Sequence, residues 1–216
     1  GTAHEQALSR GFAGDLVVDL DPGLALSTYR PGLASHLLSQ HDIRGRVLLH
    51  VGALAVDRGV ELLIRAFAAT VGQRSDWSLV LCGEGTGCVE LRALADRMGV
   101  GARVHWISNL REEELPGLIG ASTLFAMPAE DTGPEGRVVR QALACGVPVL
   151  ASRAHARLVE DDGAGLIASA DDVASWTHIL RRAASSPEGR RRWGERARAI
   201  AEDRFAWPRI AETFER

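Results

Sequence analysis

Apolar positions along this chain follow two alternating patterns. Short apolar runs, as at 47–51, are typical of buried β-strands, and each is followed by a segment whose apolar residues return every three or four positions. In 60–71, for example, Leu63, Ala66 and Phe67 fall on one face of a helix. The predicted strands are 47–51, 78–82, 104–107, 124–127 and 147–151, and the predicted helices are 60–71, 89–98, 112–120 and 137–145. This alternation indicates βαβ units, and therefore an α/β fold with a doubly wound, parallel, Rossmann-like sheet and helices on both faces.

The two ends of the chain are patterned differently from this middle part. The remaining predicted elements are a strand at 16–20, a turn at 21–23, a short helix near 33–40, an edge strand at 166–167 and helices at about 171–184 and 187–203. We therefore divide the chain into an N-terminal segment (1–45), a Rossmann-like domain (46–186) and C-terminal helices (187–216).

The composition excludes several classes of function. With 216 residues, 46% of them hydrophobic, the chain can bury a core of its own, and its net charge of −3 argues against a nucleic-acid partner. All 25 cationic residues are arginine, which excludes a Schiff-base lysine and the lysine of a Walker phosphate loop. No apolar run reaches the roughly 20 residues that span a bilayer, and no signal peptide is evident.

The cysteines point to a reduced compartment. Their odd number and their spacing fit neither a disulfide framework nor a metal site, so we expect a cytoplasmic protein. Cys82 and Cys145 fall on apolar faces of a predicted strand and a predicted helix, and they are expected to be buried structural thiols.

Glycines gather where the predicted strands end, which is where α/β sheets bind their ligands. Gly52-Ala53, Gly83-Glu84-Gly85 and Ile107-Ser108-Asn109 follow three successive strands, and the loop 128–136 follows the next. Glycine lets a ligand approach the backbone closely, and a helix start offers unpaired amides and a positive dipole end. The stretch 123–152 combines a strand, a glycine-containing loop, a helix and a second strand, and we expect it to bind a phosphate group.

Arg58 follows the first of these loops, at the start of a predicted helix. A guanidinium in that place can pair with a diphosphate in bidentate fashion, and the alternative is a solvated residue at a helix start. The loop 83–88 does not meet the dinucleotide fingerprint, because its sixth position is Cys88 rather than glycine or alanine. A mononucleotide or a sugar phosphate is therefore expected in preference to a dinucleotide.

Four blocks of the sequence, in order, resemble one known family. The blocks are RVLLHVGALAVDRGVELLIRAFA, LVLCGEG, RVHWISNLREEELPGLIGAS and GRVVRQALACGVPVLAS. They resemble the C-terminal domain of retaining GT-B glycosyltransferases of the glycosyltransferase family 4, or group 1, type. The likeness covers about 46–207, where Phe205-Ala206-Trp207 is similar to the closing helix of the family, and residues 17–32 are similar to the interdomain linker that enters this domain.

The resemblance implies one half of a GT-B fold, in which two Rossmann-like domains face each other across a cleft. The half present here would hold the nucleotide-sugar donor, linked to UDP or GDP, and its partner would be the acceptor-binding N-terminal domain, which this sequence does not include. The activity implied is transfer of a hexosyl group to an acceptor with retention of anomeric configuration, without a metal or another cofactor. We expect the chain alone to bind nucleotide but not to turn over.

Some site residues follow from this resemblance. The first loop of the family reads G-R-x(4)-K-G and binds the diphosphate, so its arginine falls on Ala53 and its lysine on Arg58, and one of the two cations is lost. The family holds the base by backbone of the third loop, and it uses glycine-rich backbone at the fourth for phosphate or sugar. For the base these positions fall on His105 through Ser108, with Ile107 and Ser108 as candidates, and for phosphate or sugar they fall on Gly136 and Arg137, with Val138 beside them. Gly52, Gly83 and Gly85 are further binding candidates because they follow the first two strands.

The acidic signature of the family, E-x-F-G-x(4)-E-A, is altered in this chain. Its first glutamate contacts sugar hydroxyls and its second the ribose diol, and these positions fall on Gly133 and Gln141. Gln141 can still hydrogen-bond a ribose hydroxyl, although more weakly than a carboxylate would. Glu130 or Glu135 can replace the sugar contact if the acidic loop is threaded differently, and the alternative is that both are solvated. We take Arg58 and Glu135 as the catalytic candidates.

Two hypotheses are compatible with these losses. One is an active transferase with altered donor contacts, and the other is a degenerate domain that serves as a binding or interaction module. Each lost charge-assisted hydrogen bond costs roughly 1.5–3 kcal/mol when nothing replaces it. We favour the enzyme, because the glycines and Arg58 persist and Gln141 is still polar.

Three further groups have competing interpretations. His50 lies within a predicted strand and is expected to be buried and hydrogen-bonded rather than catalytic. His155 follows the strand that ends near Ser152, and it is a candidate for the lining of the donor pocket. The arginine-rich segment 181–198 could contact anionic lipid at the inner face of a membrane, and a solvated helical face is the alternative.

Overall fold

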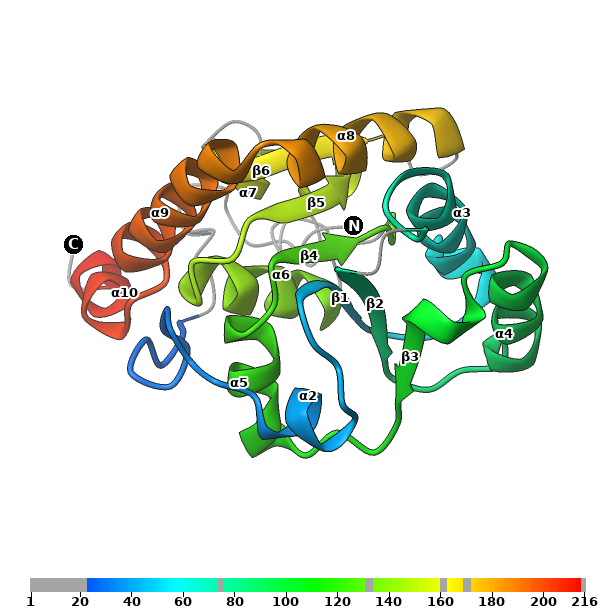
Figure 1. Cartoon of the computed structure of the whole chain (residues 1–216). Coiled ribbons are helices and arrows are strands. Elements are labelled where there is room, and N and C mark those ends of the chain that lie inside the picture. Colours follow the sequence, from blue (N-terminus) through cyan, green and yellow to red (C-terminus); the bar gives the residue numbers. More distant parts are fainter. Residues whose placement is uncertain (1–22, 74–75, 131–133, 160–162, 169–171, 215–216) are drawn as a thin grey trace, which may run out of the picture.

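The strands of the sheet run parallel in the computed structural model, which describes residues 23–73, 76–130, 134–159, 163–168 and 172–214 (Figure 1). They are β1 (Arg46–Val51), β2 (Trp77–Cys82), β3 (Val104–Ile107), β4 (Leu124–Met127), β5 (Val149–Ser152) and β6 (Gly165–Ala168). Their order across the sheet is β3-β2-β1-β4-β5-β6. This confirms the doubly wound parallel sheet, including the edge strand at 166–167. The strand predicted at 16–20 lies outside the described residues.

Helices connect these strands as the sequence predicts. They are α2 (His36–Gln40), α3 (Val60–Thr70), α4 (Cys88–Arg97), α5 (Leu115–Gly120), α6 (Pro134–Ala144), α7 (Ala156–Val159), α8 (Val173–Ser185), α9 (Pro187–Arg204) and α10 (Trp207–Phe214). Short 3₁₀ turns add η2 (Val56–Arg58), η3 (Gly101–Arg103), η4 (Glu112–Glu114) and η5 (Arg153–His155).

Prolines and a glycine explain where the boundaries differ from prediction. The helix expected at 112–120 is divided into η4 and α5, with Pro116 in the first turn of α5, where a missing N–H costs no helical hydrogen bond. For the same reason α6 begins at Pro134, earlier than the expected 137. Gly146 ends α6 in a left-handed conformation, with φ of +68°, and β5 therefore starts at Val149 rather than at 147.

Both faces of the sheet are buried, which explains why the strands read as continuous apolar runs. Neighbouring residues of β1 belong to different cores: Leu48 packs on the side of α3, α4 and α8, and Leu49 packs on the side of α5, α6 and α9. Figure 1 shows these two helical layers on either side of the strands. The helices thus hold the carboxyl ends of the strands at one edge of a rigid sheet.

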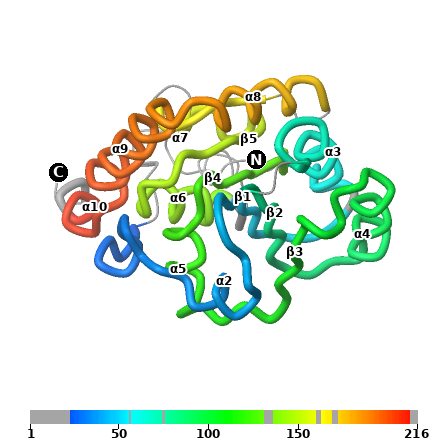
Figure 2. Tube along the Cα trace, in the orientation of Figure 1, coloured from blue at the N-terminus to red at the C-terminus, as the bar shows by residue number. Residues whose placement is uncertain are grey.

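The segment that leads into β1 joins the α6 and α9 layer and meets the C-terminal helix. The Leu24 amide donates to the Phe205 carbonyl at 2.8 Å, and the Arg198 guanidinium donates to the carbonyl oxygens of Tyr29 and Ala144 at 2.9 and 2.8 Å. Figure 2 shows this segment, in blue, beside α10, in red. Tyr29 is therefore held against α6 by contacts on its backbone.

The arginine-rich segment 181–198 forms the end of α8 and most of α9. Two of the α9 arginines pair with glutamates one turn later, Arg191 with Glu195 at 2.6 Å and Arg198 with Glu202 at 2.7 Å. None of the helices in the described ranges is long and apolar enough to cross a membrane. Contact of this segment with a membrane surface stays a prediction.

Candidate functional site

The strand order reverses between β1 and β4, and α/β sheets bind their ligands in the crevice at such a point. The loop after β1 and the loop that begins at Pro128 meet there. Gly59, with φ of +73°, lies so close that a Cβ on it would be 2.9 Å from the Pro128 Cβ. Arg58, which ends η2 and is half-buried, is thereby placed beside the loop that follows β4.

The loops after β1, β2 and β3 enclose a hollow at the carboxyl edge of the sheet, which we call the β1–β3 cavity. Its volume is about 440 Å³, and it is lined by Val51, Gly52, Ala53, Cys82, Gly83, Glu84, Asn109 and Leu110. A second hollow of about 330 Å³ adjoins it at Gly83 and Glu84 and is lined also by Gly85, Arg92, Trp106, Ile107 and Ser108. The structure therefore brings together Gly52, Ala53, Gly83, Gly85, Ile107 and Ser108, as the sequence predicts for strand-end loops.

The glycines of these loops also have a packing role that the sequence did not reveal. Gly83 has φ of +141°, and a Cβ on it would lie 2.0 Å from the Gly52 carbonyl oxygen. A Cβ on Gly85 would lie 2.3 Å from the Leu54 carbonyl oxygen. Close approach of one loop to the next, rather than of a ligand alone, thus requires glycine at both positions.

Backbone hydrogen bonds extend the sheet into these loops. The Gly52 amide donates to the Cys82 carbonyl at 3.0 Å, the Leu54 amide to the Glu84 carbonyl at 2.9 Å, and the Gly83 amide to the Ile107 carbonyl at 2.9 Å. Since these amides are already paired, they are not the groups that would bind an anion. Binding of an anion by Arg58 and by the start of α6 stays a prediction.

At the start of α6, Gly136 is buried, and a Cβ built on it would lie 3.8 Å from the Arg140 guanidinium, so access of a ligand to this turn of backbone stays a prediction. Arg137 is exposed and pairs with Glu112 at 3.2 Å, and Val138 is half-buried one residue later.

The acidic candidates are placed only in part. Glu130 is exposed in the loop between β4 and α6. Glu135 belongs to the first turn of α6, and Gly133 lies outside the described residues. Replacement of the sugar contact by Glu130 or Glu135 therefore stays a prediction.

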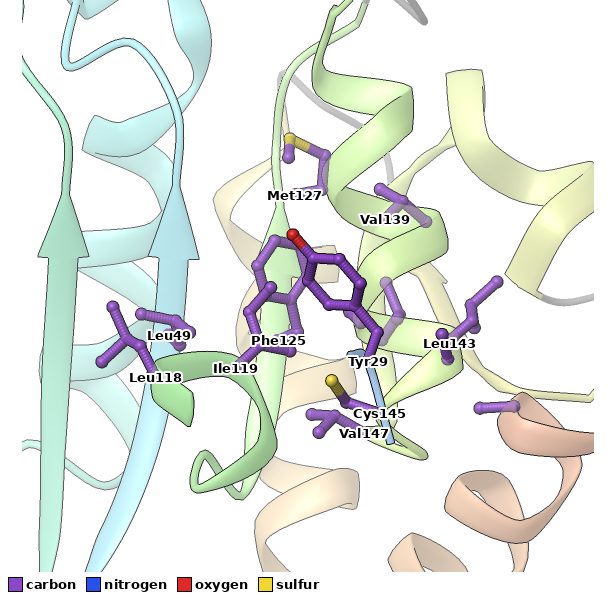
Figure 3. Close-up of a cluster of buried hydrophobic side chains, with 14 of the residues drawn as sticks. Tyr29, Leu49, Leu118, Ile119, Phe125, Met127, Val139, Leu143, Cys145 and Val147 are labelled. Carbon is purple, nitrogen blue, oxygen red and sulfur yellow. The ribbon is translucent and has the colours of Figure 1, made fainter. Parts of the chain in front are cut away.

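Gln141 has a partner within the protein that sequence reasoning missed. It is only 2% exposed, and its Nε2 donates to the Tyr29 hydroxyl oxygen at 2.8 Å. Figure 3 shows the Tyr29 ring between Phe125 and Leu143, with the hydroxyl directed toward the Met127 end of β4 and away from Cys145. The only available signal was that Tyr29 is the single tyrosine of the chain and lies in the linker-like segment.

Tyr29 also lines a hollow next to α6, which we call the linker cavity. Its volume is about 770 Å³, and it is lined by Gly23, Leu24, Ala25, Thr28, Tyr29, Glu112, Glu113, Arg137, Arg140 and Trp207. The Trp207 side chain is 59% exposed and forms an aromatic wall, opposite charged groups of both signs. Such a combination can bind a ligand that carries hydroxyl and phosphate groups together.

Comparison with known proteins agrees with the sequence blocks. The family model described as glycosyl transferases group 1 matches residues 39–200. This chain belongs to the glycosyl transferases group 1 family. The D-inositol 3-phosphate glycosyltransferase of Corynebacterium jeikeium is 29% identical to it over 180 residues, which are 79% of this chain and 42% of that protein. The D-inositol 3-phosphate glycosyltransferase of Saccharomonospora viridis is 28% identical to this chain over 215 residues, which are 94% of this chain and 49% of that protein. The chain thus spans about half the length of the curated relatives it matches.

Solved structures of group 1 and other glycosyltransferases share the fold. Anabaena Alr3699/HepE in complex with UDP and glucose superposes with a TM-score of 0.83 at 23% identity, over 99% of this chain and 59% of that one. The C-terminal domain of a group 1 family protein (LpcC) from Francisella tularensis superposes with a TM-score of 0.77 at 18% identity, over 86% of this chain and 100% of that one. The second comparison matches a separate C-terminal domain, which agrees with the Rossmann-like half of a GT-B fold.

Two histidines and two cysteines of this domain are buried, namely His50, His155, Cys82 and Cys145. His50 is buried in β1 with its Nδ1 3.0 Å from the Ala126 carbonyl oxygen, and burial lowers its pKa to about 4. His155 is also buried and does not line either of the named cavities. Burial raises the pKa of Cys82 to about 11 and that of Cys145 to about 12, so both thiols stay protonated. The expectations for His50, Cys82 and Cys145 are confirmed.

Proposed function

We propose that this domain binds the nucleoside diphosphate sugar of a glycosyltransferase, linked to UDP or GDP. In the complete enzyme, the hexosyl group of this nucleotide sugar would be transferred to an acceptor with retention of anomeric configuration. The observation that carries the proposal is the position of Arg58 at the β1/β4 reversal, where the adjacent Gly59 packs against Pro128 of the loop that leads to α6.

The comparisons support this assignment. One structure with this fold contains UDP and glucose and another contains UDP-glucose, and the relatives at 28–30% identity are named for transfer to D-inositol 3-phosphate. The acceptor site and the cleft closure that completes catalysis would belong to the half of those relatives that this chain does not cover.

The chemical role of the domain would be electrostatic. As the bond between sugar and diphosphate breaks, negative charge grows on the departing diphosphate. The Arg58 guanidinium and the first-turn amides of α6 would stabilise that charge, and Glu130 or Glu135 would position the sugar hydroxyls. We propose that arginine and backbone amides stabilise the negative charge of the phosphates without a metal ion.

The second candidate function is a binding module without catalysis. It is favoured by the β1–β3 cavity, whose lining, among the described residues, contains Glu84 and Ala53 but no cationic residue. A carboxylate in that place repels a diphosphate rather than binding it. A nucleotide panel separates the two functions, because only the transferase half requires affinity for a nucleoside diphosphate.

The panel consists of UDP, GDP, UDP-glucose and GDP-mannose, each followed by thermal unfolding and calorimetry. We expect one base series to stabilise the domain and no product to form with the 216-residue chain alone. Stabilisation by none of the four would favour the binding module, and transfer by the isolated chain would contradict the division of labour between the halves.

Arg58→Ala is expected to weaken binding of the preferred nucleoside diphosphate roughly ten- to hundredfold, because a charge-assisted hydrogen bond to the diphosphate is lost. Affinity for the corresponding nucleoside, which has no phosphate, should not change. Calorimetry of both ligands gives the two ratios.

The matched control for this substitution is Arg44→Ala, which removes an exposed arginine that pairs with Asp42 before β1, at the opposite end of the sheet. Equal weakening by the two alanine variants would mean that net charge, and not a contact from Arg58, governs binding.

A further inference from the structure

The Tyr29 hydroxyl is oriented by Gln141. Because the Gln141 amide group donates to the hydroxyl oxygen at 2.8 Å, the hydroxyl hydrogen is left to donate elsewhere. The Gln141 Oε1 atom is buried and has no hydrogen-bond partner among the described residues, so it adds no competing contact to this pair. One side of the hydroxyl is thus fixed, and none of the residues that the structure describes accepts its hydrogen.

Access separates the two residues. Tyr29 lines the linker cavity, whereas Gln141 does not, and Gln141 is the less exposed of the two, at 2% against 7%. Of this hydrogen-bonded pair, Tyr29 is therefore the residue that a ligand in the cavity can contact.

Charged groups of the cavity lie within electrostatic reach of this hydroxyl. Burial raises the pKa of the Tyr29 phenol most, the Arg137 guanidinium lowers it, and the Glu112 carboxylate raises it. With its pKa above the ordinary value, the phenol stays protonated and remains a donor at neutral pH. Arg137 and Arg140 project from successive turns of α6 into the same cavity.

We propose that Tyr29 contacts the ribose of the donor nucleotide in the linker cavity, and that Gln141 is the positioning residue behind it. A hydroxyl donor beside two guanidinium groups suits the ribose of such a nucleotide, because a sugar oxygen can accept from the phenol, while Arg137 and Arg140 add positive charge on the side of α6 next to the diphosphate that Arg58 is proposed to bind. This assignment differs from the expectation from sequence, in which Gln141 itself hydrogen-bonds a ribose hydroxyl. The inference rests on the proposed function, since it requires a nucleoside diphosphate ligand.

The test compares ribonucleotides with deoxyribonucleotides. Calorimetry would measure UDP or GDP, whichever the wild type binds more tightly, against its 2′-deoxy and 3′-deoxy analogues. The wild type should prefer the ribonucleotide over at least one analogue by about two- to tenfold, the range of one neutral hydrogen bond. Tyr29→Phe should reduce that ratio to about one by weakening the ribonucleotide alone, since the ring and its packing are kept.

Gln141→Leu should also reduce the ratio of ribonucleotide to deoxyribonucleotide affinity, but by less than Tyr29→Phe does, because the Tyr29 hydroxyl is kept and loses only the contact that orients it. The control Thr70→Val removes a hydroxyl that bonds to the Ala66 carbonyl within α3, and it should leave the ratio unchanged. Thermal unfolding of each variant shows whether it is folded, and if Tyr29→Phe does not fold, the Gln141→Leu ratio decides.

The outcomes separate this inference from the proposed function. If the wild type binds nucleotide and Tyr29→Phe leaves the ratio of ribonucleotide to deoxyribonucleotide affinity unchanged, the role of Tyr29 is overturned and the proposed function is not. A wild type that binds none of the nucleotides overturns both. A smaller ratio that results from tighter binding of the deoxy analogue also contradicts the proposal, since the phenol would then have no contact with the ribose.

Discussion

Gly83→Ala is expected to lower the free energy of unfolding by about 3–5 kcal/mol and to abolish nucleotide binding. The added Cβ would lie 2.0 Å from the Gly52 carbonyl oxygen, and φ of +141° is a conformation that alanine rarely adopts. The loops after β1 and β2 must then separate, which breaks the backbone hydrogen bonds from Gly52 and Leu54 that join them. Urea unfolding measures the loss of stability, and calorimetry with the preferred nucleotide measures the loss of binding.

Gly32→Ala is the matched control, because Gly32 also has a positive φ, of +77°, but a Cβ there meets nothing within 4 Å. It isolates the cost of the backbone conformation, which is about 1 kcal/mol. If the two variants lose equal stability, the contact between the loops is not what requires glycine at position 83.

Acid is expected to destabilise the domain through His50. In the unfolded chain this imidazole takes up a proton near its ordinary pKa of 6.5, whereas burial lowers the pKa in the folded protein to about 4. Between these values the unfolded state binds more protons, so the free energy of unfolding falls as pH falls from 6.5 to 4. The shift of about 2.5 pKa units corresponds to a loss of about 3 kcal/mol from this residue. Above pH 6.5 it contributes no pH dependence.

His50→Gln measures this contribution, because glutamine can keep a hydrogen bond to the Ala126 carbonyl without titrating between pH 4 and 6.5. Urea unfolding at several pH values should show a weaker acid dependence for this variant than for the wild type. His178→Gln removes an exposed imidazole from α8 and should follow the wild type. An acid dependence that is identical in wild type and His50→Gln would mean that other groups account for it.

Much of the fold could be predicted from the sequence because its signals are local. The continuous apolar run of β1 reflects burial on both faces of the sheet, and the periodic spacing in α3 reflects burial of one helix face. Both patterns are expected in any parallel α/β arrangement. Boundaries were harder to predict, since Pro134 and Gly146 act through backbone geometry and leave the apolar pattern unchanged.

The site was predicted in outline, because the carboxyl ends of parallel strands always meet at one edge of a sheet. The sequence therefore located Gly52, Gly83 and Ser108 near one another without a structure. It could not show that the amides of Gly52 and Gly83 are already paired, because those bonds join loops that lie far apart along the chain.

From the order of residues alone follow the parallel sheet, the family and the edge at which a ligand would bind, since periodicity and motif spacing are properties of neighbouring positions. The pairing of Tyr29 with Gln141 needed the folded chain, because the two residues are 112 positions apart and meet only when the linker segment packs on α6. The same holds for Gly59 against Pro128, which places Arg58 beside the loop after β4. Long-range packing, which no local pattern encodes, selects the side chains that face the ligand.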